Sequence, residues 1–212
     1  MGEATLGTLA ATLSSDERAR ADALRDPVAR RRFLADHGWR RRLLGARTGR
    51  SPAAIAYLVA TDGKPRLDPA GPHFSASRTG ATALYAICDE AEVGVDVEAV
   101  DDGDDRRERL AARLLAPGER VAFEALAADD RPRALAACWT RKEAHLKALG
   151  TGLVFPLTDL ELWTADERAV RRGDVVVHAV EVGPGLQAAV AVRLADGQVA
   201  DVPAVARALP GA

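Results

Sequence analysis

The carboxylate of Glu143 falls on a helix face that should be apolar. Glu143 lies four residues after Trp139 and three before Leu146, in the stretch Trp-Thr-Arg-Lys-Glu-Ala-His-Leu-Lys-Ala-Leu-Gly. This spacing places the side chain on the face that the apolar residues bury. A buried carboxylate needs a partner, and Lys147 lies one turn further on. The pair is either an ordinary intrahelical ion pair or part of a functional site.

Two further carboxylates lie in the segment Val-Gly-Val-Asp-Val-Glu at residues 93–98. Alternation places the valines on one strand face and Gly94, Asp96 and Glu98 on the other, with the carboxylates roughly 7 Å apart. One explanation is the exposed polar face of an edge strand. The other is a site for a hard divalent cation, which would convert repulsion between the carboxylates into attraction. In that case Gly94 would leave room for another group to approach.

Basic and hydroxyl side chains supply candidate anion ligands. Residues 14–50 are rich in arginine, and Arg41 and Arg42 stand among them. Such arginines form either a solvated helix face or an anion site, because guanidinium groups match phosphate oxygens in paired geometry. Ser77, Arg78 and Gly80 precede an apolar run of strand length, where a hydroxyl, a guanidinium and a glycine can together receive a phosphate.

Helices followed by strands must position these residues, and this pattern occurs twice, so we expect the α+β class. Helices are expected from Ser14 or Ser15, from Pro27, over a separate segment at 40–47 that ends near Gly49, over 110–126 with a break at Pro117, and over 133–149. Strands are expected at 81–88, 93–98, 160–163, 175–182 and 187–192, a short strand or a helix end at 54–60, and a peripheral tail at 201–212. The acidic break at 101–105 divides the chain into halves of residues 1–100 and 101–212.

Composition narrows the function classes. The 212 residues are 48% hydrophobic, which is enough to form a core. Their formal net charge of −2 gives no general attraction to nucleic acid or to an anionic membrane. No apolar stretch has the length of a membrane span, and we expect a soluble cytoplasmic protein. Cys88 and Cys138 lie in apolar runs, which favours core packing over a disulfide. The four histidines lack the spacing of a zinc site.

Two motifs, taken together, resemble a known family. Gly94–Glu98, followed about forty residues later by Trp139–Ala144 with Lys147, is similar to the signature pair of the 4'-phosphopantetheinyl transferases of the surfactin-synthetase-activating type. Arg41–Gly45 is similar to the early arginine segment of this family, Gly63–Pro65 to its Gly-Lys-Pro turn, and Phe74–Gly80 to its phosphate-contacting strand edge. Together these matches cover most of the chain.

The resemblance implies a pseudo-twofold pair of similar α/β halves, with coenzyme A bound in the cleft between them. It assigns magnesium, which manganese can replace, to Asp96, Glu98 and Glu143. It places Lys147 at the pyrophosphate of coenzyme A. The residues that it places around the nucleotide and its phosphates are Arg41, Arg42, Lys64, Pro65, Ser77 and Arg78. Arg78 departs from the family, which commonly has histidine there, so a permanent cation replaces one that titrates.

The resemblance further implies that a serine of an apo acyl or peptidyl carrier protein attacks the β-phosphate of coenzyme A and that 3',5'-ADP leaves. Glu143 would take the serine proton directly or through a metal-bound water, and Lys147 would stabilise the departing phosphate. Other functions that fit these residues are a metal-dependent phosphohydrolase and a binding module without catalysis. We expect a monomer. The carrier would meet an apolar strip flanked by Arg113 and Arg120, unless the strip is core: Leu110, Leu114, Leu115 and Phe123.

Overall fold

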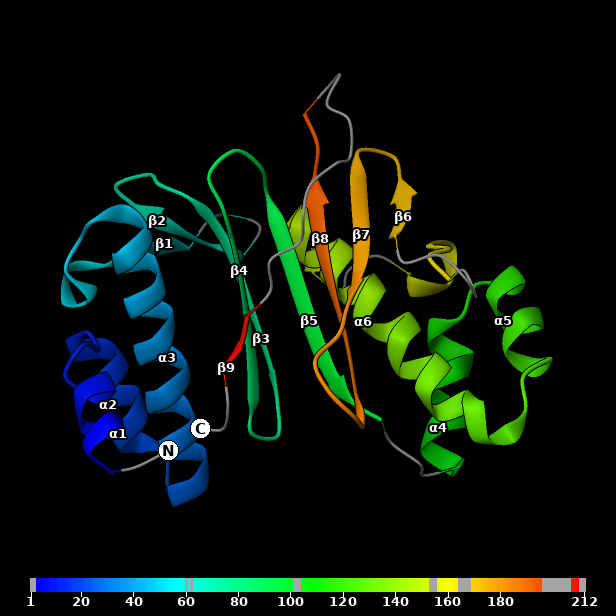
Figure 1. Ribbon diagram of the computed structural model, residues 1–212, viewed down its shortest axis with the longest axis horizontal. Coiled ribbons are helices and arrows are strands. Elements are labelled where there is room, and N and C mark those ends of the chain that lie inside the picture. The colour runs from blue at the N-terminus through cyan, green and yellow to red at the C-terminus, as the bar shows by residue number, and fades with distance from the viewer. Residues whose placement is uncertain are drawn as a thin grey trace.

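A computed structural model describes residues 3–59, 61, 63–100, 104–152, 156–163, 169–195 and 207–209. Helices flank the sheets on both sides (Figure 1), which confirms the mixed helix and sheet architecture. The helices are α1 (Glu3–Ala10), α2 (Ser15–Ala23), α3 (Pro27–Thr48), α4 (Asp104–Leu114), α5 (Pro117–Glu124) and α6 (Arg131–Leu149). The strands are β1 (Ala56–Val59), β2 (Pro65–Asp68), β3 (His73–Thr79), β4 (Thr82–Cys88), β5 (Val93–Ala99), β6 (Ala169–Arg172), β7 (Val175–Val180), β8 (Leu186–Arg193) and β9 (Arg207–Leu209).

Helices α2 and α3 begin at the signals that the sequence predicts, whereas α1 was not predicted. Ser14 caps α2 in a capping box with Glu17, and Pro27 is in the first turn of α3. The two helical segments expected between Pro27 and Gly49 are in fact one continuous helix of 22 residues. The helix continues because no residue between them breaks it, and it ends where Gly49 takes the left-handed conformation with φ 70°.

Three antiparallel sheets form the centre of the molecule. Their strand orders are β1-β2, β3-β4-β9 and β5-β8-β7-β6, and Asp96 of β5 is opposite Ala189 of β8. The strand expected at 160–163 does not form, although Leu160 and Leu162 are buried in the core. In the expected tail, Arg207–Leu209 forms β9 beside β4, and the other tail residues lie outside the described part of the chain.

Hydrogen bonding crosses the predicted division after residue 100 in both directions. β5 precedes that point and pairs with β8, whereas β9 follows it and pairs with β4. Within the expected break, residues 101–103 are outside the described residues, and α4 already begins at Asp104. The two predicted halves are therefore interlocked through their sheets.

The core lies on both faces of the β5-β8-β7-β6 sheet. Val93, Val95 and Val97 pack on one side with side chains of β4, β7 and β8. On the other side, α6 packs against β7 and β8 through Ala144 and Ala148. This packing places α6 directly against the β5 face that carries the two strand carboxylates.

A further cluster joins α4, α5 and α6, and it accounts for the apolar strip that the sequence offered as a carrier surface. Leu114, Leu115 and Phe123 are at most 3% exposed, and Leu110 packs against them while partly buried. Core packing is therefore the correct explanation for these residues. Val121 lies on the outside of α5 and is 70% exposed.

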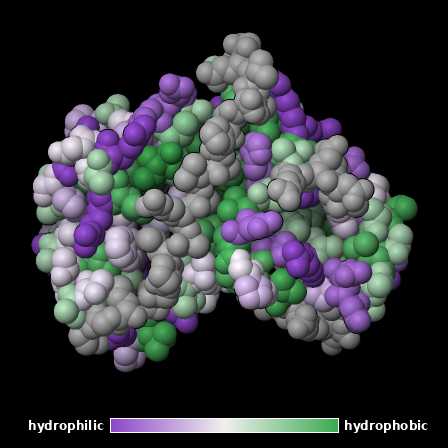
Figure 2. Space-filling view, in the orientation of Figure 1, coloured by the Kyte–Doolittle hydropathy of each residue, from purple (hydrophilic) through white to green (hydrophobic). Residues whose placement is uncertain are grey.

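The surface is mixed in character. On the face seen in Figure 2, hydrophilic and hydrophobic residues are interspersed over both sides of the molecule. The large hydrophobic residues that are exposed belong to separate elements, with Val28 on α3, Leu58 and Val59 on β1, and Val121 on α5. Of the helices that the structure describes, none has the length and apolar character needed to cross a membrane.

Candidate active site

Strand β5 and helix α6 approach each other unusually closely at Gly94. A Cβ atom added there would lie 1.9 Å from the carbonyl oxygen of Ala144 and 2.6 Å from the amide nitrogen of Ala148. The space at Gly94 is thus filled by the backbone of α6, which is the close approach that the glycine leaves room for. The close contact brings the Asp96 and Glu98 face of β5 against the helix that bears Glu143 and Lys147.

Asp96 is the most buried of the three carboxylates, with 3% of its surface exposed. Its Oδ1 accepts hydrogen bonds from the Lys147 ammonium at 2.7 Å and from the Ser77 hydroxyl at 2.7 Å. Lys147 also donates to the carbonyl of Val95 at 3.1 Å. The other carboxylate oxygen, Oδ2, is buried and has no hydrogen-bond partner. Oδ1 of Asp96 is therefore held by two hydrogen bonds, whereas Oδ2 is available to bind a ligand.

A row of hydroxyl side chains on β3 faces β5. Ser75 Oγ accepts the Val95 amide at 3.1 Å, and Ser77 Oγ donates to Asp96. Thr79 Oγ1 lies 3.5 Å from a carboxylate oxygen of Glu98. Because side chains alternate along β3, these three lie on the same side of the strand. They connect the β3-β4-β9 sheet to the β5-β8-β7-β6 sheet next to the carboxylates.

Glu143 occupies a polar but poorly solvated position. Burial raises the pKa of Glu143, the charges of Asp96 and Glu98 raise it further, and Lys147 opposes the shift. Its Oε1 is buried without a hydrogen-bond partner. The ion pair of Lys147 is with Asp96 on β5, so the ordinary intrahelical pair is not what holds this helix face. The exposed edge-strand explanation for Asp96 is likewise wrong, because that face is buried.

These observations fit a divalent cation. No group of three His, Cys, Asp or Glu side chains in the described ranges is arranged as a ready-made metal site. Even so, Asp96 Oδ2 and Glu143 Oε1 are buried oxygens that lack partners, and Glu98 is near enough to affect the pKa of Glu143. Oxygen ligands that repel one another are the set that magnesium binds and neutralises.

A hollow of about 310 Å³ opens beside these residues. Lys147 lines it from α6, Lys64 from the turn before β2, and Pro65 from the first position of β2. The Lys64 ammonium donates to the carbonyl of Lys147 at 2.8 Å and to Glu92 at 2.6 Å, so segments distant in sequence meet at its wall. Arg40 of α3 also lines the hollow.

Three residues predicted around the nucleotide lie elsewhere. Arg41 is 2% exposed and donates to Glu17 at 2.5 Å and to the Ile55 carbonyl at 2.7 Å, so it ties α3 to its neighbours. Arg42 is exposed, and its guanidinium lies over the Trp39 ring at 5.2 Å. Arg78 lines a separate, smaller hollow next to α3. None of these three lines the hollow of Lys64 and Lys147, and neither does Ser77, whose hydroxyl donates to Asp96.

Sequence reasoning missed a buried ion pair next to Glu143. Lys142 is 0% exposed and contacts Glu119 at 2.5 Å, the carbonyl of Leu114 at 2.6 Å and that of Leu157 at 2.9 Å. Glu119 also accepts amide hydrogen bonds from Ala116 and Leu162. The pair fixes α6 to α5 and to the loop before β6, and it thereby sets the position of Glu143. The available signal in the sequence was Glu119, an acidic residue in the first turn of the helix expected after Pro117.

Comparisons with known proteins agree with this arrangement. A model of the 4'-phosphopantetheinyl transferase superfamily matches residues 92–190, which include all three carboxylates and Lys147. The 4'-phosphopantetheinyl transferase HetI of Nostoc sp. is 36% identical over 164 residues, 76% of this chain and 68% of HetI. The protein slr0495 of Synechocystis sp. is 32% identical over 68% of this chain and 59% of its own length. A holo-[acyl-carrier-protein] synthase of Streptococcus thermophilus is 36% identical over 35% of this chain and 63% of its own.

Proposed function

Because the chain belongs to the 4'-phosphopantetheinyl transferase superfamily, we propose that it transfers the 4'-phosphopantetheine arm of coenzyme A to a serine of an apo carrier protein. The chain is thus an enzyme of the phosphopantetheinyl transferase type. Coenzyme A and a carrier protein are its substrates, and 3',5'-ADP is the second product.

The observation that supports this proposal most directly is the convergence of Asp96, Glu98 and Glu143 near Lys147, which itself lines the hollow. Carboxylates next to a lysine, beside a cavity with further cations, suit a substrate that brings both a pyrophosphate and a metal ion. A hydrolase built on the same carboxylates is the alternative that the sequence left open. Similarity to proteins named as phosphopantetheinyl transferases favours transfer.

We assign magnesium to Asp96, Glu98 and Glu143, with manganese as a substitute. When bound, the ion would neutralise pyrophosphate charge and stabilise the charge that develops during transfer. Lys147 binds the pyrophosphate, since its ammonium is already directed to Asp96 and lines the hollow. Ser77 keeps Asp96 oriented through its hydroxyl hydrogen bond.

The proposed reaction forms one bond and breaks one. The carrier serine oxygen bonds to the β-phosphorus, and the bond from that phosphorus to the oxygen of the 3',5'-ADP leaving group breaks. Glu143 accepts the serine proton, directly or through a water molecule. Lys147 stabilises the charge that accumulates on the leaving phosphate.

A mass measurement tests the proposal. Purified protein is mixed with coenzyme A, magnesium and an apo acyl carrier protein, and the carrier is then weighed by mass spectrometry. We expect a phosphopantetheine increment on the carrier, and none when its acceptor serine is replaced by alanine. Release of phosphate or nucleotide without carrier would instead show hydrolysis. Binding of coenzyme A with neither outcome would show a binding module.

Finer assignments are also part of the proposal. The surfactin-synthetase-activating subtype rests on the paired motifs at residues 94–98 and 139–144. Residues 1–100 and 101–212 are proposed as two similar halves with the active site between them, since the hollow has walls from both. We further propose a monomer that acts in the cytoplasm on acyl or peptidyl carriers. A panel of apo carriers would identify the preferred substrate.

A further inference from the structure

Lysine is rare in this protein. The 212 residues include 26 arginines but only three lysines, which are Lys64, Lys142 and Lys147. An ammonium is a compact charge with three donors, whereas a guanidinium is a planar fork that matches a phosphate or a carboxylate. Lysine therefore suits a site whose acceptors lie in different directions.

The ammonium of Lys64 meets three acceptors. Nζ donates to Glu92 Oε2 at 2.6 Å, to the carbonyl of Val93 at 2.9 Å and to the carbonyl of Lys147 at 2.8 Å. The Lys64 side chain is only 9% exposed. The three protons of the ammonium match these three acceptors. A phosphate in the hollow would have to displace one of them in order to bind Lys64.

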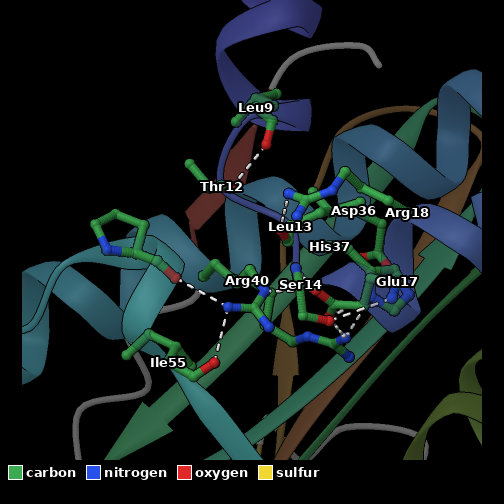
Figure 3. A network of polar contacts seen from close by, with 12 residues as sticks. Leu9, Thr12, Leu13, Ser14, Glu17, Arg18, Asp36, His37, Arg40 and Ile55 are labelled. Carbon is green, nitrogen blue, oxygen red and sulfur yellow. Dashed lines mark hydrogen bonds and ion pairs between the residues drawn. The ribbon is translucent and has the colours of Figure 1, made fainter.

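Two other buried cations have the same arrangement and hold the fold together. Arg41 binds the carboxylate of Glu17 and backbone carbonyls that include that of Ile55 (Figure 3). Lys142 binds the carboxylate of Glu119 and two backbone carbonyls. In each case one carboxylate balances the charge, and the carbonyls belong to segments distant in sequence. The contacts of Lys64 are of the same kind.

Lys64 reaches α6 at a carbonyl that the helix itself leaves unpaired. The last four carbonyls of a helix lack intrahelical partners, and Lys147 lies in the last turn of α6, which ends at Leu149. A cation at this end also interacts favourably with the helix dipole. The second carbonyl, that of Val93, is at the start of β5. Lys64 thus joins the end of α6 to the start of β5, next to the close contact at Gly94.

Lys147 is consequently held at two points. Its backbone carbonyl accepts from Lys64, while its own ammonium donates to Asp96 at 2.7 Å and to the carbonyl of Val95 at 3.1 Å. A lysine side chain is long and flexible, so the position of its ammonium depends on where its backbone is fixed. Loss of the contact from Lys64 would allow the Lys147 ammonium to move relative to Asp96.

Glu92 orients Lys64. Its Oε2 accepts from Lys64, whereas its Oε1 contacts Arg66 at 3.2 Å and His73 at 3.3 Å. Burial alone would raise the pKa of Glu92, but the hydrogen bond and charge of Lys64 lower it, with smaller contributions from His73 and Arg66. The carboxylate is therefore ionised at neutral pH and balances the charge of the ammonium.

We propose that Lys64, oriented by Glu92, positions Lys147 for the transfer reaction and does not bind the nucleotide phosphates. This inference rests on the proposed function, because it takes Lys147 as the residue that stabilises the leaving phosphate. It replaces the phosphate contact that the family resemblance implied for Lys64. Lys64 is thus a positioning residue, although it lines the same hollow.

Steady-state kinetics and calorimetric titration with coenzyme A distinguish a positioning residue from a phosphate ligand. In Lys64→Met, which has a side chain of similar length without donors, we expect kcat to fall about 10- to 100-fold, as for a misplaced catalytic group. The dissociation constant of coenzyme A should rise by a smaller factor, because the leaving phosphate carries more charge in the transition state than in the bound substrate. Lys64→Arg should not restore kcat, since a planar fork cannot reach three acceptors in different directions.

Glu92→Gln gives opposite results for the two roles. Removal of a negative charge beside a phosphate ligand would leave coenzyme A bound as tightly as before or more tightly. Loss of the residue that orients Lys64 should instead lower kcat, as in Lys64→Met. The double variant should be no worse than Lys64→Met, because both changes disrupt one contact. Arg66→Met, which removes the cation on the other oxygen of Glu92, is the matched control and should keep the wild-type kcat.

Because the chain has three lysines, the position of Lys147 can also be measured without substrate. In protein made with isotopically labelled lysine, NMR resolves one Cε signal for each lysine, and substitution assigns them. The signal of Lys147 should shift in Lys64→Met and in Glu92→Gln. The signal of Lys142, in its separate ion pair with Glu119, should not shift. A Lys147 signal that stayed in place in both variants would overturn the positioning role.

The other outcomes separate this inference from the proposed function. Recovery of kcat in Lys64→Arg, a loss of coenzyme A affinity with kcat unchanged, or a loss of melting temperature alone would overturn the inference while transfer by the wild type still supported the function. A wild type that did not modify the carrier would overturn the proposed function, and the lysine signals would still decide whether Lys64 holds Lys147. If Lys64→Met does not fold, Glu92→Gln provides both the kinetic and the NMR comparison.

Discussion

At the scale of single residues, buried charges are the distinctive property of this protein, and each is stabilised differently. Glu17 is surrounded by donors, Asp96 is half bonded, and Glu143 faces two other carboxylates. A carboxylate that accepts several hydrogen bonds stabilises the fold, whereas a carboxylate close to other carboxylates is available to bind a cation or a proton.

Glu17 should make stability depend on pH. Burial alone would raise its pKa, but hydrogen bonds from His37, Ser14 and Arg41 lower it from 4.5 to about 2. The folded pKa is below the unfolded one, so the stabilisation is present above pH 4.5 and is lost as pH falls toward 2. We expect a loss of about 3 kcal/mol of unfolding free energy over that range.

Denaturant titrations at several pH values measure this loss. Glu17→Gln should be less stable than wild type at pH 7 and should lack this part of the acid dependence. Asp16, exposed on the same helix, provides the matched control as Asp16→Asn. An unchanged acid profile in Glu17→Gln would contradict the assignment.

Glu143→Gln separates activity from stability. We expect carrier modification to fall about 100- to 10,000-fold, because the amide cannot accept the serine proton. The pKa of Glu143 is raised by burial and by Asp96 and Glu98, so its ionised form is disfavoured in the folded protein. Removing that charge should leave the melting temperature at or above that of wild type. Glu90→Gln, at an exposed site, is the control, and near-normal transfer by Glu143→Gln would refute the site.

The sequence identified some of these residues and missed others for physical reasons. Glu143 interrupts an apolar helical pattern, and Asp96 and Glu98 alternate with the valines of a strand, so both patterns can be seen in the sequence. Which of Arg40, Arg41 and Arg42 lines the hollow could not be predicted, because α3 has polar residues on most of its faces and its orientation depends on packing.

At the scale of elements, the site depends on one close contact between β5 and α6. The strand provides Asp96 and Glu98 and the helix provides Glu143 and Lys147, so their separation fixes the distance between the ligands. The helix over 133–149 and the strand over 93–98 were both predicted, because each has clear periodicity and a glycine or proline near its end. Periodicity did not predict their contact, because the contact depends on an absent side chain at Gly94, and only the family resemblance implied it.

Gly94→Ala should therefore damage fold and site together. The added Cβ would overlap the Ala144 carbonyl and force the helix away from the strand. We expect a loss of about 3 kcal/mol in unfolding free energy, at the upper end for overpacked positions. Transfer should fall further than the loss of folded protein explains. Gly7→Ala is the control, because its Cβ meets no atom within 4 Å, and equal stabilities for both variants would disprove the argument.

At the scale of the whole molecule, segments distant in sequence share both the sheets and the hollow. β5 and β9 each pair across the predicted division, and the wall of the hollow combines Lys64 with Lys147. The sequence predicted two similar halves from the order of elements. It could not show this interlocking, because strand partners at large sequence separation leave no local pattern.

Coenzyme A should stabilise the molecule as one unit. At a concentration 100 times its dissociation constant, a ligand that binds only the folded state adds about 2.7 kcal/mol to the unfolding free energy. We expect one calorimetric transition that moves to higher temperature as a whole. Pantetheine, which lacks the phosphates, should produce little shift. Two transitions, of which only one responded to coenzyme A, would show that the two parts unfold independently.

The hydroxyl row between β3 and β5 makes one backbone amide a natural reporter of the site. The Val95 amide donates to Ser75 Oγ, a side-chain acceptor that can rotate away while both strands stay intact. Its proton should exchange with solvent deuterium whenever the two sheets separate locally. The neighbouring hydroxyls of Ser77 and Thr79 contact Asp96 and Glu98. Binding of magnesium and coenzyme A should therefore slow amide exchange at Val95. Exchange at Val176, in strand β7, should not change. NMR would then record occupancy of the site without any label on substrate or carrier.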